Sequence, residues 1–382
     1  MKLKVSPAFS GVLKAAFSAS TFGPLGNGER FVYVKALLTE CFVYAASLQE
    51  GVLVKFDASE FVEIEAEGEA FFPKRLADFL VSFGKELPED AVISSEDSRE
   101  TRGEIPVEVD VEKIVVYLNG AATLCLNQPT LNADALRQPT ACDGEYCEID
   151  GGDLTPALER AVKYASDPAI EKTPALTGVL FKASGSELRV VACDTKRLFT
   201  TTWDFETPVP ETFERVVFSK TLAKILRLLR GDVVEIAAGP DSLFFRSGVV
   251  EARVQTIDGR YPNLLPILEK KGERDATLDV EETLAASRRV DVVNESKQTG
   301  ELRYAFRTGE VVVSSPSTSY GEAEIGTTCR YSKPPTTVRF TNAYILDYLS
   351  SCVDEYVRVY FNENTPITFE DSLGTTIIMP LA

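Results

Sequence analysis

A short pattern that occurs three times constrains this chain more than any other feature. Each copy is a β-like run, a phenylalanine, a residue suited to a helix N-terminus (Pro, Ser or Thr) and an amphipathic helix. The copies are AFFPKRLADFL around Phe72, VFSKTLAKIL around Phe218 and VRFTNAYILDYL around Phe340. A chain that repeats one helix in this way is expected to fold as three similar units.

Two further elements recur with the pattern and define the units. A strand pair with a turn glycine follows each helix: KIVVYL and AATLCL around Gly120, DSLFFR and VVEARVQTI around Gly248, TPITFED and TTIIMP around Gly374. An earlier helix is predicted at 7–20, 153–166 and 281–294, and the later ones at 73–85, 219–231 and 341–353. We therefore predict an α+β fold of three repeated domains, 1–149, 150–268 and 269–382, each with two helices packed on β-sheets.

The composition is that of an ordinary globular protein. The 382 residues are 44% hydrophobic and 26% charged, and no uninterrupted apolar run approaches the roughly 18 residues that a membrane span needs. Pro7, Ser10 and Lys14 interrupt the apolar N-terminal stretch, which favours a first strand and helix over a signal peptide. Seven scattered cysteines without a CxxC pair favour reduced thiols and a cytoplasmic location. A bridge between Cys142 and Cys147 is the less favoured alternative.

The chain contains no histidine, which removes several classes of chemistry. Ser-His-Asp and Cys-His catalysis, histidine bases and histidine metal ligands are excluded. An enzyme that uses carboxylates, such as the pair Asp347 and Asp371 or the run EDSRE, is the alternative, but no motif places two acids around a substrate. GPLGNG lacks the Lys-Ser/Thr of a phosphate loop. We predict no enzymatic activity, no metal and no cofactor.

Positive charge is concentrated on the predicted helices. The six segments together carry +5 in a chain of −18, so the remainder carries −23, and 219–231 alone carries +4. In that segment the side chains of Leu222, Ile225, Leu226 and Leu229 form one apolar stripe, and Lys220, Lys224 and Arg227 lie on another face. Such cations are most simply a solvated surface. If the helices share one surface, they would instead bind a polyanion through its phosphates, without reading sequence.

Four phrases in order make the chain resemble a known family. They are LRVVACDTKRL, GVVEARVQTIDGRYPNLLPIL, FTNAYILDYLSS and the terminal TTIIMPLA. The chain resembles the bacterial sliding clamp, the beta subunit and processivity factor of the replicative DNA polymerase. The resemblance implies a head-to-tail homodimer that forms a ring of six domains around duplex DNA. It also implies tethering of the polymerase, clamp loader and repair polymerases through short hydrophobic peptides, with no membrane partner and no catalysis.

The resemblance implies three sets of site residues. The joint between copies would include Leu124, Leu126, Val292, Val293 and the segment EVVVSSPSTSYGEAEI. DNA would face Lys14, Arg30, Lys74, Arg75, Arg160, Lys163, Lys220, Lys224 and Arg227. The groove for partner peptides would be lined by Leu176, Thr195, Arg197, Leu198, Pro262, Ile267, Tyr344, Ile377, Ile378, Met379, Pro380 and Leu381.

The chain also departs from the family pattern. Thr195 and Lys196 stand where the family often has Gly-His, and Pro266 stands where a basic residue is common. The acidic run SSEDSRETRGEIPVEVDVE reads as a surface insertion. These departures favour, as the alternative function, a clamp-fold scaffold of a specialised or mobile-element replication system with altered partner preference.

Overall fold

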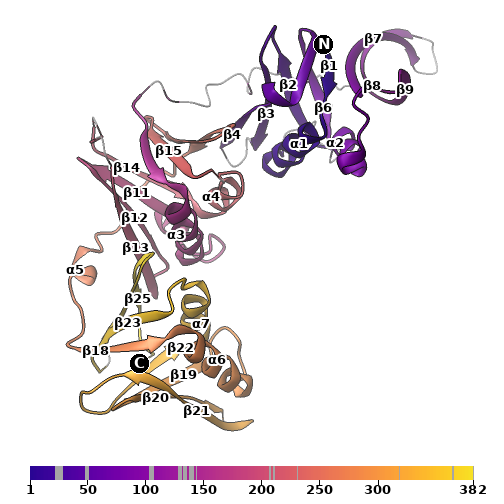
Figure 1. The fold of residues 1–382 in the computed structure, drawn as a ribbon. Helices are drawn as coiled ribbons and strands as arrows, with labels where there is room; N and C mark the ends of the chain where they lie inside the picture. The colour runs from indigo at the N-terminus through magenta and orange to yellow at the C-terminus, as the bar shows by residue number, and fades with distance from the viewer. Residues whose placement is uncertain are drawn as a thin grey trace. The chain divides into compact units, whose positions relative to one another are not determined.

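The computed structural model describes residues 1–21, 29–47, 51–102, 107–127, 131, 136, 142, 144–205, 208–209, 211–229, 231–317, 319–363 and 365–381. The phrase GPLGNG lies outside these residues. Figure 1 shows the course of the chain and its helices and strands. By their internal contacts the residues form two compact units. Unit 1 is Met1–Gly151 with Lys220–Thr256, and unit 2 is Gly152–Ser219 with Ile257–Ala382.

Unit 1 contains two sheets. The five-stranded sheet has the order β5 (Val62–Ala66), β1 (Lys2–Val5), β7 (Val92–Arg102), β8 (Val107–Leu118), β9 (Ala121–Asn127). The eight-stranded sheet has the order β10 (Cys147–Asp150), β15 (Val233–Ala238), β16 (Ser242–Ser247), β17 (Val250–Gln255), β4 (Val52–Asp57), β3 (Cys41–Ser47), β2 (Phe31–Ala36), β6 (Gly68–Pro73). Helices α1 (Pro7–Ala19) and α2 (Lys74–Phe83) pack against each other, and α4 (Ser219–Leu226) leads into β15.

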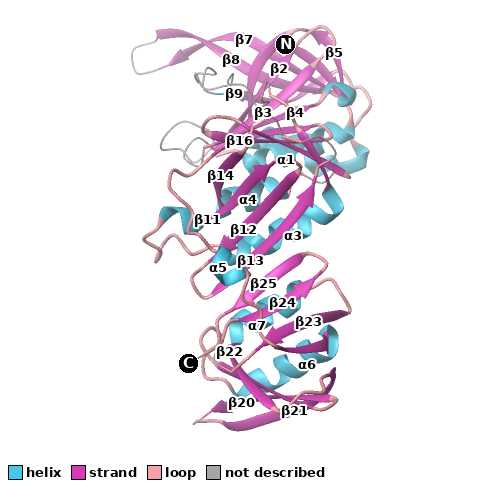
Figure 2. Cartoon of the chain, turned by 90° about the vertical axis from the view of Figure 1, so that its left-hand side faces the viewer, coloured by secondary structure: helices cyan, strands magenta, loops and turns pink. Residues whose placement is uncertain are grey.

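Unit 2 is organised around one continuous sheet. Its order is β14 (Phe213–Phe218), β11 (Gly178–Ser184), β12 (Glu187–Cys193), β13 (Arg197–Asp204), β25 (Gly374–Ile378), β24 (Ile367–Asp371), β23 (Tyr356–Phe361), β18 (Arg274–Asp279), β21 (Gly321–Arg330), β20 (Glu310–Ser317), β19 (Glu301–Arg307), β22 (Thr336–Thr341). Its helices are α3 (Gly151–Tyr164), α5 (Leu265–Leu268), α6 (Val280–Val290) and α7 (Asn342–Ser351), of which α6 and α7 are in contact. Figure 2 shows β13 and β25 side by side.

The repeated elements that the sequence predicts are present. All six predicted helices form, although α4 ends at Leu226, before the predicted end at 231. Its predicted apolar stripe is buried: Leu222 and Ile225 are fully covered, and Leu226 and Leu229 nearly so. The turn residues Gly120 and Gly248 have φ of +74° and +55°, which glycine adopts at little cost. The predicted α+β fold with repeated domains is therefore confirmed, while the boundaries at 149 and 268 stay a prediction.

The acidic run after Ser94 extends a hairpin. Strands β7 and β8 pair continuously from Val92 opposite Tyr117 to Arg102 opposite Val107, and residues 103–106 lie outside the described part. The run thus continues the ladder beyond the end of β9. Cys142 and Cys147 are both free thiols, as the sequence favours. Within the described residues, none of the helices is both long and apolar enough for a membrane crossing.

Two antiparallel ladders join one repeat to the next. In unit 1, β17 of the middle repeat pairs with β4 of the first, from Val250 opposite Phe56 to Val254 opposite Val52. In unit 2, β25 of the last repeat pairs with β13 of the middle one, from Arg197 opposite Ile378 to Thr200 opposite Thr375. In both ladders the last strand of one repeat pairs with a strand of the repeat before it. That strand is the third of a three-stranded meander, which is β2, β3 and β4 in the first repeat and β11, β12 and β13 in the middle one.

The packing of α4 gives a first prediction. Leu222→Ala should lower the free energy of unfolding by about 2–5 kcal/mol, because the leucine is fully buried and alanine leaves a cavity. Lys220→Ala, on the exposed face of the same helix, should change the free energy of unfolding by no more than about 0.5 kcal/mol. Urea denaturation of both variants measures the difference. Equal stabilities would contradict the assignment of the two faces.

Candidate partner groove and helix surface

An apolar pocket of about 180 Å³ opens in unit 2 beside the ladder of β13 and β25. The hairpin turn between β12 and β13, the segment after Tyr261 and the end of the chain all contribute to it. Its lining residues are Leu176, Cys193, Thr195, Lys196, Arg197, Leu198, Pro262, Leu264, Ile267, Ile377 and Met379. Ile267 and Met379 are 39% and 40% exposed, so apolar surface remains open to an incoming side chain.

The pocket collects eight of the twelve residues predicted for the groove. These are Leu176, Thr195, Arg197, Leu198, Pro262, Ile267, Ile377 and Met379. Tyr344, Ile378, Pro380 and Leu381 do not line it. Ile378 is fully buried in the core of the last repeat, because consecutive side chains of β25 point to opposite faces and Ile377 takes the pocket side.

Three lining residues were missed by the sequence prediction. Cys193 is the ladder partner of Leu198, Lys196 is in the same turn as Thr195, and Leu264 lies between Pro262 and Ile267. Cys193 and Lys196 could have been predicted from the hairpin in ACDTKRL, because they flank residues that were already placed in the groove. Burial raises the pKa of the Cys193 thiol, so this cysteine contributes as an apolar wall more than as a nucleophile.

Arg197 connects the pocket to two helices. Its Nε donates to Asp194 at 2.8 Å, one terminal nitrogen donates to Asp347 of α7 at 2.8 Å, and the other donates to the carbonyl of Lys163 in α3 at 2.8 Å. The guanidinium lies 4.7 Å from the ring centroid of Tyr164 and 4.8 Å from that of Tyr344. Burial opposes the charge of Arg197, but the two carboxylates outweigh it and raise its pKa. Tyr344 thus supports the groove through Arg197.

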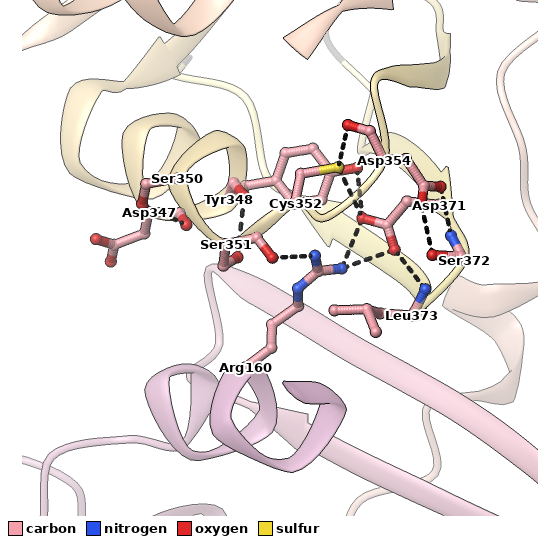
Figure 3. Close-up of polar contacts among 10 residues, drawn as sticks. All are labelled: Arg160, Asp347, Tyr348, Ser350, Ser351, Cys352, Asp354, Asp371, Ser372 and Leu373. Carbon is pink, nitrogen blue, oxygen red and sulfur yellow. Dashed lines mark hydrogen bonds and ion pairs between the residues drawn. The ribbon is translucent and has the colours of Figure 1, made fainter. Parts of the chain in front are cut away.

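Arg160 corrects the predicted set of DNA-facing residues. Its side chain is fully buried, and its guanidinium forms an ion pair with the equally buried Asp371 at 2.7 Å (Figure 3). It also donates to the carbonyl of Ser351 at 2.7 Å and lies 5.4 Å from the ring centroids of Phe199 and Tyr348. Arg160 therefore fastens α3 to the last repeat and is not available to DNA.

Asp371 is the acceptor at the centre of this cluster. Besides Arg160, it accepts hydrogen bonds from the hydroxyl of Tyr348 at 3.1 Å and the main-chain N–H of Leu373 at 3.0 Å. Burial and the neighbouring Asp371 raise the pKa of Tyr348, which stays protonated and able to donate. Burial, then Asp371, raises the pKa of Cys352 to about 11. The carboxylates Asp347 and Asp371 are thus each paired with an arginine.

The other predicted cations lie on or next to the helices of their own unit. Lys14, Arg75, Lys163, Lys220 and Arg227 are exposed, and Arg30, Lys74 and Lys224 are partly buried. Some are already engaged: Arg75 pairs with Glu29 at 3.3 Å, and Arg30 donates to the carbonyl of Phe17 at 3.1 Å. Within unit 1, Lys14 of α1 and the pair Lys74 and Arg75 of α2 belong to helices in contact.

The residues predicted for the joint lie on strand edges and a short helical turn. Leu124 and Leu126 are half-buried on β9, whose only ladder among the described strands is with β8. Val292 is 72% exposed and Val293 is half-buried, both in the turn Asp291–Val293. The segment 310–325 forms β20 and the start of β21, with residue 318 outside the described part.

Comparison with known proteins gives one consistent result. Residues 160–263 match the family model "DNA polymerase III beta subunit, central domain". The beta sliding clamp of Pseudomonas putida is 23% identical over 323 residues, 82% of each chain, and that of Bacillus subtilis is 23% identical over 67% of this chain and 68% of its own. The chain has the fold of the bacterial beta sliding clamps and is similar to them in sequence. The sequence-based resemblance is confirmed.

Solved structures extend the match to the whole chain. The DnaN sliding clamp of Pseudomonas aeruginosa bound to griselimycin superposes with a TM-score of 0.82 at 19% identity, covering 100% of this chain and 99% of that one. The Bacillus subtilis DNA polymerase sliding clamp gives a TM-score of 0.81 at 18% identity, with the same coverage. At these identities the structures establish the fold of all three repeats.

The buried ion pair gives a second prediction. Asp371→Asn should lower the free energy of unfolding by about 3–5 kcal/mol, because it leaves the buried guanidinium of Arg160 without its counter-charge. The double change Arg160→Met with Asp371→Leu should recover most of the loss, because it removes both charges and keeps the volume filled. Chemical denaturation of the two variants tests this. An Asp371→Asn protein as stable as the wild type would refute the pairing.

Proposed function

We propose that the chain is a DNA sliding clamp, two copies of which close head to tail into a ring around duplex DNA. The ring tethers the replicative polymerase, the clamp loader and repair polymerases, and performs no catalysis of its own. The observation that carries this proposal is the pattern of strand edges. Two equivalent joints are occupied within the chain. Among the described strands, β9 and residues 321–328 of β21 each have a ladder on one side only, and these two edges would form a third joint.

The third joint follows from the repeat. Strands β4, β13 and β21 are the third strands of the three meanders, and β17, β25 and β9 are the last strands of their repeats. β17 pairs with β4, and β25 pairs with β13. The remaining strands are β9 in the first repeat and β21 in the last. Residues 321–328 of β21 have a ladder only with β20 among the described strands. Pairing β9 with β21 of a second copy completes the series.

The proposed joint is heterologous, which makes closure possible. The first repeat of one copy meets the last repeat of the other, and the same contact forms again at the opposite end. Pairing would cover two open edges that otherwise invite uncontrolled association. Leu124 and Leu126 supply apolar side chains on β9, and Val292 and Val293 supply them in the last repeat. The domain division 1–149, 150–268 and 269–382 gives six domains in the closed dimer.

The helices supply the proposed DNA surface. Lys14, Arg30, Lys74, Arg75, Lys163, Lys220, Lys224 and Arg227 would face the duplex, and Arg160 is removed from this set. Side chains of this kind contact phosphates, carry no sequence information and release counterions on binding. The six helical segments carry +5 and the remainder of the chain carries −23, so the rest of the surface repels the same polyanion.

The apolar pocket beside Met379 is the proposed site for partner peptides. Its walls are mainly aliphatic, and the exposed polar side chains of Thr195 and Lys196 at its edge can hold a peptide backbone. A larger pocket of about 450 Å³ adjoins it. The charged side chains that line this pocket already form ion pairs with each other, Lys182 with Glu214 and Arg189 with Glu187, so it is a less suitable site for an apolar peptide. Thr195 and Lys196 in the apolar pocket favour the alternative of a specialised replication system. Binding of polymerase and loader peptides from the same genome separates the two functions.

The oligomeric state gives a third prediction. The wild-type chain should have twice the single-chain mass of 41.9 kDa in light scattering, and negative-stain images should show closed rings. Leu124→Asp with Leu126→Asp should reduce the mass to that of one chain, because it buries charge along the β9 edge. The matched control is Leu37→Asp with Leu38→Asp, which adds the same two carboxylates at leucines that are 37% and 81% exposed after β2 and should remain a dimer. A wild-type monomer at every concentration would refute the ring.

DNA binding gives a fourth prediction. The logarithm of the binding constant for a duplex should fall with the logarithm of salt concentration, with a slope of about −0.9 per phosphate contact. Lys220→Glu with Arg227→Glu should therefore make the slope shallower by about 1.8. The control is Lys172→Glu with Lys270→Glu, two exposed lysines outside the helices with the same change of charge. Equal slopes for the two double variants would refute a helix-specific surface.

A further inference from the structure

Thr195 adopts a backbone conformation that threonine rarely accepts. Its φ is +70°, in the left-handed region, where a β-branched side chain crowds its own main chain. Among the described residues, Asn119 is the only other non-glycine with a positive φ, at +50°. Asn119 is in the turn between β8 and β9, and asparagine tolerates this conformation. Thr195 is thus the strained position of the two.

The surrounding turn holds Thr195 in place. The carboxylate of Asp194 accepts the main-chain N–H groups of Lys196 at 3.1 Å and Arg197 at 2.9 Å, and Nε of Arg197 at 2.8 Å. The N–H of Asp194 donates to the carbonyl of Arg197 at 3.1 Å, and the carbonyl of Lys196 accepts from the N–H of Met379 at 2.8 Å. Five hydrogen bonds therefore fix the turn from both sides. Strain of this kind persists only where neighbouring contacts over-determine the backbone.

The strained residue lies where a partner would bind. Thr195 is exposed and lines the apolar pocket, in the same turn as Lys196 and next to Met379, the residue that the turn itself holds. A glycine would adopt the same φ without steric cost and would leave the hydrogen bonds of the turn intact. The turn therefore gains nothing from the threonine side chain. What the side chain adds is a methyl group and a hydroxyl at the edge of the pocket.

We propose that Thr195 is a specificity-determining residue of the groove, where its side chain narrows the opening and limits which apolar side chains of a partner peptide can enter. This inference rests on the proposed function of the pocket as a peptide site. The size of the effect follows from the chemistry, because one methyl-sized difference in an apolar pocket changes selectivity by about tenfold or more.

The test compares peptide selection by four proteins. A hexapeptide phage library is enriched on the wild type, Thr195→Gly, Thr195→Asn and Asn119→Gly, and the enriched peptides are measured by fluorescence polarisation. Thr195→Gly should accept bulkier side chains, with the Kd ratio between bulky and small peptides shifted by about tenfold. Thr195→Asn relieves the strain but keeps a side chain at the opening, so it should not accept the bulkier side chains that Thr195→Gly accepts. Asn119→Gly, remote in sequence and in the other unit, should select as the wild type does.

Thermal unfolding provides a second readout that does not depend on binding. Thr195→Asn should raise Tm by about 2 °C because asparagine relieves the strain, and Thr195→Gly should raise it less because glycine adds freedom to the unfolded chain. An unchanged Tm for Thr195→Asn, or identical selection by Thr195→Gly and the wild type, would overturn the inference. Failure of the wild type to enrich any peptide that competes at the pocket would instead refute the proposed peptide site.

Discussion

The antiparallel ladder between β13 and β25 is the interaction on which the described site depends. It consists of main-chain hydrogen bonds, so it joins the middle and last repeats whatever their side chains. By joining them it places Leu198 beside Ile377, which sets two walls of the apolar pocket. It also brings the turn at Lys196 within reach of Met379. The same ladder holds α3 and α7 close enough for two arginines to connect them.

Those two arginines use their charge to connect parts of the fold. The resemblance implies DNA contact for Arg160 and the partner groove for Arg197, and both lie in ion pairs within the chain. Arg160 is fully buried against Asp371, and Arg197 is nearly buried between Asp194 and Asp347. Removing charges from water costs several kcal/mol per ion, and good pairing geometry only offsets that cost. Such pairs are therefore weak sources of stability. Their directional hydrogen bonds instead fix the orientation of helix relative to helix, which a ladder at the sheet alone does not determine.

The sequence predicted what local patterns determine. The repeated helices and hairpins were found because periodicity and turn glycines act within a few residues, and the stripe from Leu222 to Leu229 was found for the same reason. The burial of Arg160 could not be predicted, because its partner Asp371 is 211 residues away. Ile378 was misplaced because the face of β25 depends on its pairing register with β13. The extension of β7 and β8 was not predicted because its acidic composition resembles a loop.

The repeat also gives a physical reason for the proposed pairing of two copies. A tandem array of repeats that joins the third strand of one repeat to the last strand of the next always leaves one edge of each type open, however many repeats it contains. Among the described strands those edges are residues 321–328 of β21 in the last repeat and β9 in the first. A single chain could cover them only by bending back on itself. In the proposed dimer, a second chain covers both open edges of the first. A heterologous contact that closes after two copies ends the addition of further copies, whereas a contact that does not close would give filaments. The same strand pairing that builds the pocket inside one chain therefore favours a closed dimer between two.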